Sequence, residues 1–277
     1  SEIALEAGRS GAGGGGGASV GSVLDTASGT RYFVKSGGLN AFNMLNAEFQ
    51  GITDMDAAPD GIRVPTPIAV GTGESNAFAV FEYLDFCGGG DGREMGARLA
   101  QMHRHTSPDG RYGWRMDNTI GATPQPNGWM DNWAEFWVER RLKHMLKLAG
   151  TAGMDSEALI AKTYDLLKDH KPEPSILHGD LWGGNAGYVN VDGTVEPVIF
   201  DPATYYGDRE SDIAMTYLFG GFGSDFYVGY EEAWELPEGH EQRKVIYNLY
   251  HILNHYVLFG GGYIQQAKGM ARQIMNF

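Results

Sequence analysis

Cysteine is almost absent from the sequence, which has only Cys87 among its 277 residues. One thiol cannot form an internal disulfide or a cysteine-based zinc site, so the cysteine content favours a reducing compartment. No apolar run approaches the roughly 18 residues that span a bilayer. The chain also lacks the basic segment and apolar core that open a signal peptide. We therefore expect no membrane partner and a cytoplasmic protein, or an organellar one if a targeting peptide has been removed.

Basic residues are scarce, since 21 Lys and Arg accompany 35 Asp and Glu, and the formal net charge is -14. A chain with this charge repels nucleic acids and anionic membrane surfaces, so we expect no nucleic-acid partner. Hydrophobic residues make up 42% and aromatic residues 12% of the chain, as in an ordinary globular enzyme. A chain of this length can build one large domain or two lobes.

The most informative stretch contains Asp180, Asn185 and, further along the chain, Asp201. Asn185 follows Asp180 by five residues, and Asp201 follows Asn185 by sixteen. A phosphotransferase site requires this order of groups: one carboxylate accepts the proton of the attacking hydroxyl, while an amide oxygen and a second carboxylate hold magnesium on the nucleotide phosphates. The pattern predicts a kinase that uses ATP and Mg²⁺, with Asp180 as the catalytic base and Asn185 and Asp201 as metal ligands.

A glycine-rich segment at residues 8–21 precedes two short strands expected at residues 20–25 and 30–35, which read as a hairpin. For an isolated glycine run, a flexible linker is the usual interpretation. Ahead of a hairpin, glycines are also typical of a phosphate-covering loop, because backbone amides approach the oxygens with no Cβ in the way. The candidate residues are Gly15, Gly16 and Gly17.

Lys35, at the end of this hairpin, is a candidate ligand of the α- and β-phosphates, although a surface lysine is the alternative. The helix expected at residues 40–56 carries an apolar stripe at helical spacing, with Glu48 at its edge. From there Glu48 can reach Lys35, as the helix glutamate of kinases does. We therefore expect an ion pair between Lys35 and Glu48.

The remaining pattern predicts an α+β fold with two lobes. Strands expected at residues 65–71 and 77–84 complete a mostly antiparallel sheet, so residues 1–84 form a small N-lobe with one helix. Residues 85–277 are mainly helical and form a larger C-lobe that carries the catalytic segment. In this lobe, a helix is expected at residues 132–149, and a short apolar strand at residues 197–200 precedes Asp201. Asp212 lies on the first turn of a helix and can brace the catalytic loop by accepting backbone N–H bonds, although the helix dipole explains it equally well. His103 is interpreted as a core or surface histidine and not as a ligand.

The sequence resembles the fructosamine (ketosamine-3-) kinases, within the larger group with aminoglycoside-phosphotransferase and protein-kinase-like folds. His178-Gly179-Asp180 with the downstream Asn185 and Asp201 is shared by the whole group. Trp182-Gly183-Gly184 and residues 117–127 are more specific to the family. The matching segments are residues 117–127, 177–185, 199–203, 206–212 and 258–263, and the resemblance covers nearly the whole chain.

The resemblance implies transfer of the ATP γ-phosphate to the 3-hydroxyl of ketosamines, which are ribulosamine or fructosamine adducts of small amines or protein lysines. The phosphorylated adduct breaks down, so the family is regarded as performing protein deglycation and repair. Lys35 and Glu48 would position the phosphates, while Glu82 and Leu84 would offer backbone groups to adenine. Trp182 would pack against the sugar or amine, with structural packing as the alternative.

The sequence departs from many relatives at one point, because they carry a cysteine in the glycine-rich loop that is implicated in redox control through an intersubunit disulfide. Residues 8–30 contain none here, and we expect a monomer or weak homodimer. Two other functions stay open: another small-molecule kinase of the aminoglycoside or choline type, and a nucleotide-binding pseudokinase. The chain retains all five catalytic candidates, which argues against the pseudokinase. They are Lys35, Glu48, Asp180, Asn185 and Asp201.

Overall fold

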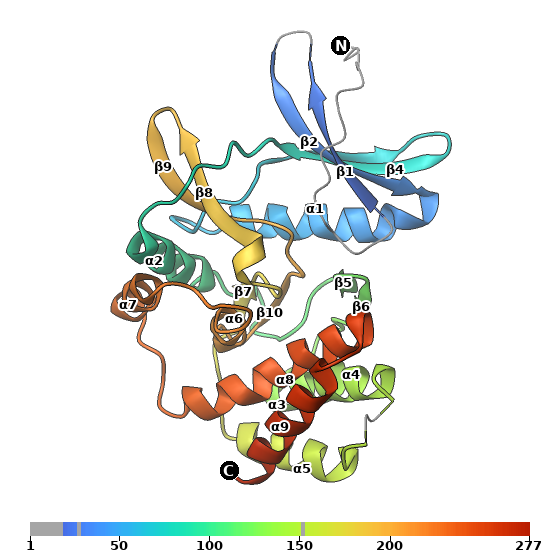
Figure 1. Ribbon diagram of the computed structural model, residues 1–277, viewed down its shortest axis with the longest axis vertical. Helices are drawn as coiled ribbons and strands as arrows, with labels where there is room; N and C mark the ends of the chain where they lie inside the picture. The colour runs from blue at the N-terminus through green and yellow to red at the C-terminus, as the bar shows by residue number, and fades with distance from the viewer. Residues whose placement is uncertain (1–18, 27–28, 151–152) are drawn as a thin grey trace.

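The computed structural model describes residues 19–26, 29–150 and 153–277. A sheet and one long helix lie at one end of the molecule and a group of helices at the other (Figure 1). The sheet is antiparallel with strand order β1-β2-β4-β3. Its strands are β1 (Ser19–Asp25), β2 (Arg31–Gly38), β3 (Pro67–Thr72) and β4 (Asn76–Glu82). The predicted two-lobe α+β architecture is thus confirmed.

Helix α1 (Phe42–Asp56) packs against the sheet, where the sequence predicted a helix. Leu45 and Ile52 of its apolar stripe are fully buried, while Phe42 and Phe49 are partly buried. Burying a leucine or isoleucine side chain contributes about 1.5–3 kcal/mol, so these contacts hold α1 on the sheet. The interior strand β2 therefore carries Lys35, and the facing side of α1 carries Glu48.

The larger lobe is mainly helical, as expected. No helix in the described ranges is long and apolar enough to cross a bilayer. The expected helix at residues 132–149 consists of three consecutive segments, in which a π-helical turn at Trp137–Leu142 separates α3 (Trp133–Phe136) from α4 (Lys143–Leu148). The other helices are α2 (Gly92–His103), α5 (Ser156–Leu167), α6 (Glu210–Thr216), α7 (Ser224–Ala233), α8 (His240–Phe259) and α9 (Tyr263–Met275).

Three two-stranded antiparallel sheets complete this lobe, and the sequence predicted only part of one. That sheet pairs β8 (Ala186–Val191) with β9 (Thr194–Ile199), so the apolar strand before Asp201 has a partner. Asp192 and Gly193 form the turn with φ of 51° and 89°, a left-handed pair that suits a tight hairpin. The other two sheets pair β5 (Asn118–Ile120) with β6 (Thr123–Gln125), and β7 (Ser175–Leu177) with β10 (Tyr205–Gly207).

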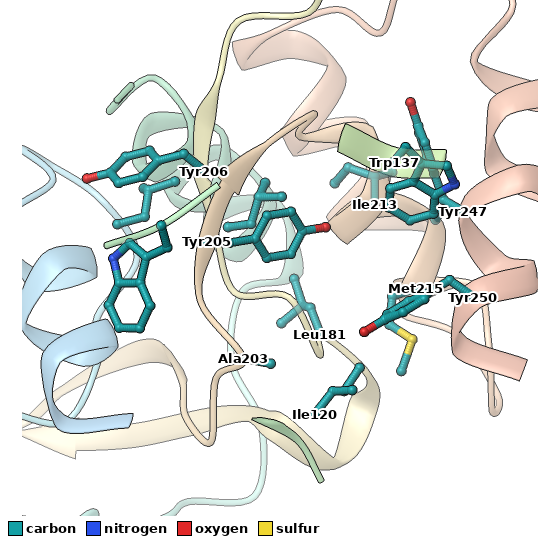
Figure 2. Close-up of a cluster of buried hydrophobic side chains, with 14 of the residues drawn as sticks. Ile120, Trp137, Leu181, Ala203, Tyr205, Tyr206, Ile213, Met215, Tyr247 and Tyr250 are labelled. Atoms are coloured by element: carbon teal, nitrogen blue, oxygen red, sulfur yellow. The ribbon is translucent and has the colours of Figure 1, made fainter. Parts of the chain in front are cut away.

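The core of the larger lobe is rich in aromatic side chains that join the catalytic loop to α8. Figure 2 shows Tyr205 between Leu181 of the catalytic segment and the aromatic side chains that include Tyr247 and Tyr250. Trp137 makes edge-to-face contacts with Tyr247 and Tyr250, at centroid distances of 4.7 and 5.8 Å. All these side chains are almost completely buried. This packing supplies a rigid support for the loops above it.

Helices α2 and α7 lie side by side (Figure 1) and approach so closely that their backbones touch. A Cβ added to Gly96 of α2 would lie 2.0 Å from the carbonyl oxygen of Phe226. A Cβ added to Gly229 of α7 would lie 2.0 Å from the carbonyl oxygen of Arg93. Only glycine permits this approach. The contact fixes the position of α2, whose last residue, His103, contacts Asp212 of α6 at 3.2 Å.

Candidate active site

Lys35 forms two short ion pairs, one within its own lobe and one with the larger lobe. Its Nζ lies 2.6 Å from Oε1 of Glu48 on α1 and 2.6 Å from Oδ1 of Asp201, which follows β9. Burial lowers the pKa of the Lys35 ammonium, but the Coulombic attraction of Glu48 and Asp201 outweighs this effect and raises it. Lys35 therefore stays charged. The predicted pairing of Lys35 with Glu48 is confirmed, and the structure adds Asp201 as a second partner.

Asp180 lies at the floor of a cavity, beside Asn185. The Nδ2 of Asn185 donates to the main-chain oxygen of Asp180 at 2.9 Å and approaches its Oδ2 at 3.5 Å. Burial, together with the negative charges of Asp201 and Asp212, raises the pKa of Asp180 to about 7. A carboxyl group with this pKa is poised to exchange a proton near neutral pH, which is the property that a general base requires.

Asp212, on the first turn of α6, braces the catalytic loop. Its carboxylate accepts hydrogen bonds from the backbone N–H groups of His178 (2.7 Å) and Gly179 (2.8 Å) and contacts Nε2 of His103 at 3.2 Å. Burial raises the pKa of Asp212, but the hydrogen bonds from His103 and Gly179 outweigh it and hold the pKa below its usual value. The predicted brace is confirmed, and His103 is a core histidine as expected.

Asp201 adopts a left-handed backbone conformation, with φ of 58°. Few residues other than glycine adopt this conformation, and it persists where the surrounding structure enforces it, often at functional sites. Two hydrogen bonds enforce it here: Phe200 N donates to the Asn185 carbonyl at 3.0 Å, and Ala203 N donates to the His178 carbonyl at 2.8 Å. The loop that carries Asp201 is thus bonded to the loop that carries Asp180.

A cavity of about 460 Å³ opens between the sheet and the larger lobe. Glu82 and Leu84, the predicted hinge residues, line one end of it, and Lys35 and Asp201 line the other. The walls between them are largely apolar. They include Val23, Phe33, Ile52, Phe81 and Phe200. A mostly apolar cavity of this volume, with a few charged groups on its lining, suits a bound nucleotide.

The side chain of Glu82 forms hydrogen bonds with neighbouring residues of its own lobe. Its Oε1 accepts from Arg63 at 2.5 Å, and its Oε2 accepts from the N–H and hydroxyl of Thr66 at 3.1 and 3.2 Å. Arg63 also lies 3.4 Å from Glu196 on β9. Glu82 is therefore bonded within its own lobe, and Arg63 connects it to β9 of the larger lobe. Because these partners occupy the carboxylate, the main-chain groups of Glu82 are the ones left for a ligand.

A second cavity, of about 240 Å³, meets the first at Lys35, Asp201 and Asn185. Asp180 lies in this second cavity alone, while Trp182 lines both and is 39% exposed. The two cavities thus offer space for a nucleotide and for an acceptor, with the acidic groups between them. This arrangement suits direct transfer of a phosphoryl group from one bound molecule to the other.

The second cavity is lined by residues that the pattern of catalytic groups did not predict. Most of them come from two segments noted in the sequence only for their resemblance to a family, residues 117–127 and 258–263, while Asn254 and His255 precede the second segment on α8. Near them, Phe219 adopts a left-handed φ of 54° and contacts both the Trp182 ring and the His255 ring. The lining residues contributed by the hairpin and by α8 are Asn118, Thr119, Gly121, Asn254, His255, Leu258 and Phe259. Gly15, Gly16 and Gly17 lie outside the described residues.

Comparison with known proteins gives a consistent assignment. A family model described as fructosamine kinase matches residues 7–277. A Synechocystis protein named "Probable ketoamine kinase" is 48% identical over 251 residues, which cover 89% of this chain and 83% of that protein. An Arabidopsis thaliana "Protein-ribulosamine 3-kinase, chloroplastic" is 40% identical over 268 residues, covering 93% and 79%.

A solved structure from Haemophilus somnus 129PT, named "Putative fructosamine-3-kinase", has the same fold. It superimposes with a TM-score of 0.87 and 28% identity, and the match covers 98% of this chain and 92% of that one. The likeness therefore extends over both the sheet-containing lobe and the helical lobe, with the two cavities between them. The chain belongs to the fructosamine kinase family, and it is a kinase that acts on ketosamines.

Proposed function

We propose that the protein transfers the γ-phosphate of ATP to the 3-hydroxyl of a ketosamine, carried by a small amine or by a protein lysine. The observation that carries this proposal is the meeting of the two cavities at Lys35, Asn185 and Asp201, beside Asp180. One relative's name specifies a protein-ribulosamine 3-kinase, which supports the 3-hydroxyl as acceptor and ribulosamines among the substrates.

In this proposal Asp180 is the general base. Its carboxylate accepts the proton of the 3-hydroxyl as the sugar oxygen bonds to the γ-phosphorus and the bond from that phosphorus to the β-γ bridging oxygen breaks, releasing ADP. Lys35, held by Glu48, contacts the phosphates. Gly15, Gly16 and Gly17 cover the phosphates, and the main-chain groups of Glu82 and Leu84 bond the adenine edge. Trp182, on the wall of both cavities, packs against the sugar or its amine.

Asn185 and Asp201 fit a magnesium ion. Because Nδ2 of Asn185 is turned to the Asp180 carbonyl, its Oδ1 is the atom left for a ligand. Asp201 supplies a carboxylate, and Mg²⁺ prefers such oxygen ligands. When bound, the ion would neutralise charge on the nucleotide phosphates. The protein's own contribution is to hold both oxygen donors on loops that are bonded to each other.

We divide the chain between Leu84 and Asp85, where the last strand of the sheet leads into the larger lobe. We also propose that the protein is a monomer or weak homodimer of the cytoplasm. An organelle is the alternative, since one relative is named as chloroplastic. The single thiol of Cys87 suits either reducing compartment.

Turnover assays with matched acceptors test the substrate assignment. ATP consumption is measured with ribulose-lysine, fructose-lysine and kanamycin, and phosphorylation of the 3-hydroxyl is verified by NMR. We expect turnover of at least one ketosamine and none of kanamycin. A kanamycin rate above that of every ketosamine would assign the protein to the aminoglycoside kinases, and binding of ATP without any transfer would make it a pseudokinase.

The metal assignment has its own test. We expect Asp201→Ala to abolish transfer at ordinary magnesium concentrations, because the ion loses its only carboxylate ligand in the proposed pair. EDTA should stop the wild-type enzyme, and excess Mg²⁺ should restore it. Activity that survives EDTA would contradict the assignment of Asn185 and Asp201 as metal ligands.

A further inference from the structure

Arg141 is a fully buried cation in the π-helical turn at Trp137–Leu142. Its guanidinium donates to the carbonyl of Pro126 and to Oδ1 of Asn127, each at 2.7 Å. The guanidinium carbon lies 4.0 Å from the centroid of the Tyr205 ring. No carboxylate pairs with Arg141 among residues 19–26, 29–150 and 153–277. Aromatic faces and neutral oxygens therefore surround this charge.

A buried cation of this kind is a costly element of a core. Removing charge from water costs several kcal/mol, and replacement of buried ionic groups by apolar groups of similar volume is often neutral or stabilising. Stability alone thus gives no reason for an arginine at this position. Short π-helical segments are also frequent at functional sites. Both observations indicate a functional role for the hydrogen bonds of Arg141.

Arg141 sets the direction of a chain of amide hydrogen bonds. An arginine can only donate, so Asn127 must turn its Oδ1 towards Arg141 and its Nδ2 away. That Nδ2 donates to Oδ1 of Asn118 at 2.8 Å, which turns the Asn118 Nδ2 to the carbonyl of Thr204 at 2.8 Å. The orientation of each amide is therefore fixed along the whole chain of hydrogen bonds, from Arg141 in the π-helical turn to Thr204, three positions after Asp201.

Gln125 makes a second connection to the same loop. Tyr250 donates to Oε1 of Gln125 at 2.7 Å, so its Nε2 is free to donate to the carbonyl of Ala203 at 3.0 Å and to Asn118 Oδ1 at 2.9 Å. All three amides lie in the segment 117–127, and Asn118 also lines the second cavity. The chain thus bonds the cavity wall to the loop that carries Asp201.

We propose that Arg141 is a positioning residue for phosphoryl transfer: through Asn127, Asn118 and Gln125 it fixes the Asp201 loop in the geometry that holds the metal and nucleotide. This inference rests on the proposed function, in which Asp201 is a metal ligand. Asp201 has a left-handed φ, and the carbonyls bonded by the amides belong to Ala203 and Thr204, directly after Pro202. Loss of these bonds releases the loop on one side.

Two variants test the inference. Arg141→Met keeps most of the side-chain volume and removes the donors, and Gln125→Glu keeps the shape but cannot donate to Ala203. Arg104→Met is the control, since Arg104 also stacks on an aromatic ring, that of Trp234, and donates to a backbone carbonyl, but it is exposed and remote from the cavities. The readouts are melting temperature, kcat, and Mg²⁺-dependent binding of a fluorescent ATP analogue. The binding measurement needs no sugar acceptor.

We expect Arg141→Met and Gln125→Glu to weaken the Mg²⁺-dependent binding of the ATP analogue, so that more Mg²⁺ is needed for the same binding. Both should also lower kcat by about 10–100-fold, the usual effect of losing a group that orients a metal ligand. Arg141→Met leaves the Pro126 carbonyl and Asn127 Oδ1 without this donor, so its melting temperature should fall below that of wild type, and its kinetics are measured at a temperature where it is still folded. Arg104→Met should change neither metal dependence nor kcat. Wild-type metal dependence in a folded Arg141→Met would overturn the inference. If that variant does not fold, Gln125→Glu decides in the same way.

The outcomes separate this inference from the proposed function. If the wild-type protein phosphorylates no ketosamine but the two variants bind nucleotide with a weaker Mg²⁺ response, the acceptor assignment fails and the positioning role stands. If ketosamine turnover is normal in wild type and in both folded variants, the proposed function stands and the positioning role fails.

Discussion

At the scale of single residues, Asp180, which we propose as the base, shows how a site can adjust a carboxyl group to neutral pH. A carboxyl group in water loses its proton far below pH 7, so the resulting carboxylate has little affinity for a proton at pH 7. Burial and the charges of Asp201 and Asp212 raise the pKa of Asp180 to about 7, so that its affinity for a proton matches the task. The same negative neighbours make the ionised form costly for the folded protein. Activity and stability therefore make opposite demands on this side chain.

We expect kcat/KM for ATP, measured at subsaturating ATP, to rise with pH through about 7 and level off near pH 8. Only ionised Asp180 accepts a proton, and kcat/KM reports the enzyme before ATP binds. At saturating ATP and Mg²⁺ the positive ion stabilises the carboxylate, so the midpoint of kcat should lie at lower pH. A stopped-rate assay over buffers of constant ionic strength measures both profiles. A flat profile between about pH 6 and about pH 8 would contradict the role of Asp180.

Asp180→Asn should lower turnover by roughly 10²–10⁴-fold, because an amide cannot accept the hydroxyl proton, while ATP still binds. The same variant should melt at a higher temperature than wild type at about pH 8. Since the folded pKa of Asp180 lies above its unfolded value, ionisation costs stability as pH rises from about 4 to about 7, and asparagine avoids this cost. Calorimetry at several pH values measures the difference, which should vanish near pH 4. Near-normal turnover would rule out Asp180 as the base.

At the scale of elements, the first turn of α6 connects the helical lobe to the catalytic loop. Asp212 accepts two backbone N–H bonds from residues 178 and 179 and contacts His103 at the end of α2. One short helix therefore aligns two other segments, and the alignment depends on a charged acceptor. A helix-dipole role alone would place the carboxylate near its own helix and not on a loop 33–34 residues earlier in the chain.

Asp212→Asn should lower the free energy of unfolding by about 2 kcal/mol, since hydrogen bonds to a charged group contribute roughly 1.5–3 kcal/mol and an amide makes fewer of them. Turnover should also fall, because the loop of Asp180 loses its anchor. Urea unfolding and a kinetic assay measure the two effects. The control is Asp225→Asn, an exposed aspartate on the first turn of α7. Equal effects of the two variants would mean that only the helix dipole matters.

Much of the fold could be predicted from the sequence because its elements have regular patterns. The strands around Lys35 and the stripe of α1 follow local periodicity, and the pair of Lys35 with Glu48 follows from their kinase-like order. The partner of β9 was not predicted, although Asp192-Gly193 is a hairpin signal in the sequence. The β5–β6 pair was not predicted because Pro124 lies within it and proline argues against a strand.

Other features of the site depend on contacts that no local pattern contains. The bond from Lys35 to Asp201 joins residues far apart in the chain, and it exists only once the lobes are packed. Arg141 lies in a stretch whose aromatic stripe predicts an ordinary core helix, and nothing in that periodicity marks a π-helical turn. One wall of the second cavity is likewise formed by residues 118–121 and 254–259, which carry no chemical motif, and family resemblance pointed only to part of them.

At the scale of the whole molecule, the single cysteine limits how the protein can respond to oxidation. Cys87 lies just after the hinge and is partly buried, and its Sγ is 3.9 Å from the carbonyl oxygen of Gly89. A disulfide needs a partner thiol with its Cα within about 7 Å, and this chain offers none. Only a second molecule could supply that partner.

We expect similar activity with and without reductant, and no covalent dimer on non-reducing gels after mild oxidation. The glycine-rich segment at residues 8–21 has no thiol, so oxidation cannot join this segment of two molecules by a disulfide. The matched control is Cys87→Ser, which should behave as wild type in both assays. An oxidised dimer whose activity returns with dithiothreitol, and which is missing in Cys87→Ser, would show a redox switch at Cys87.

The contact between α2 and α7 has a consequence for how the sequence can change during evolution. At Gly96 and Gly229 even alanine, the smallest substitution, would force two backbones apart. The movement would carry His103 away from Asp212, although neither glycine lies near a cavity. By contrast, nothing lies within 4 Å of a Cβ added at Gly183. In a library of single substitutions, two glycines remote from the chemistry should therefore tolerate less variation than a glycine beside the catalytic aspartate.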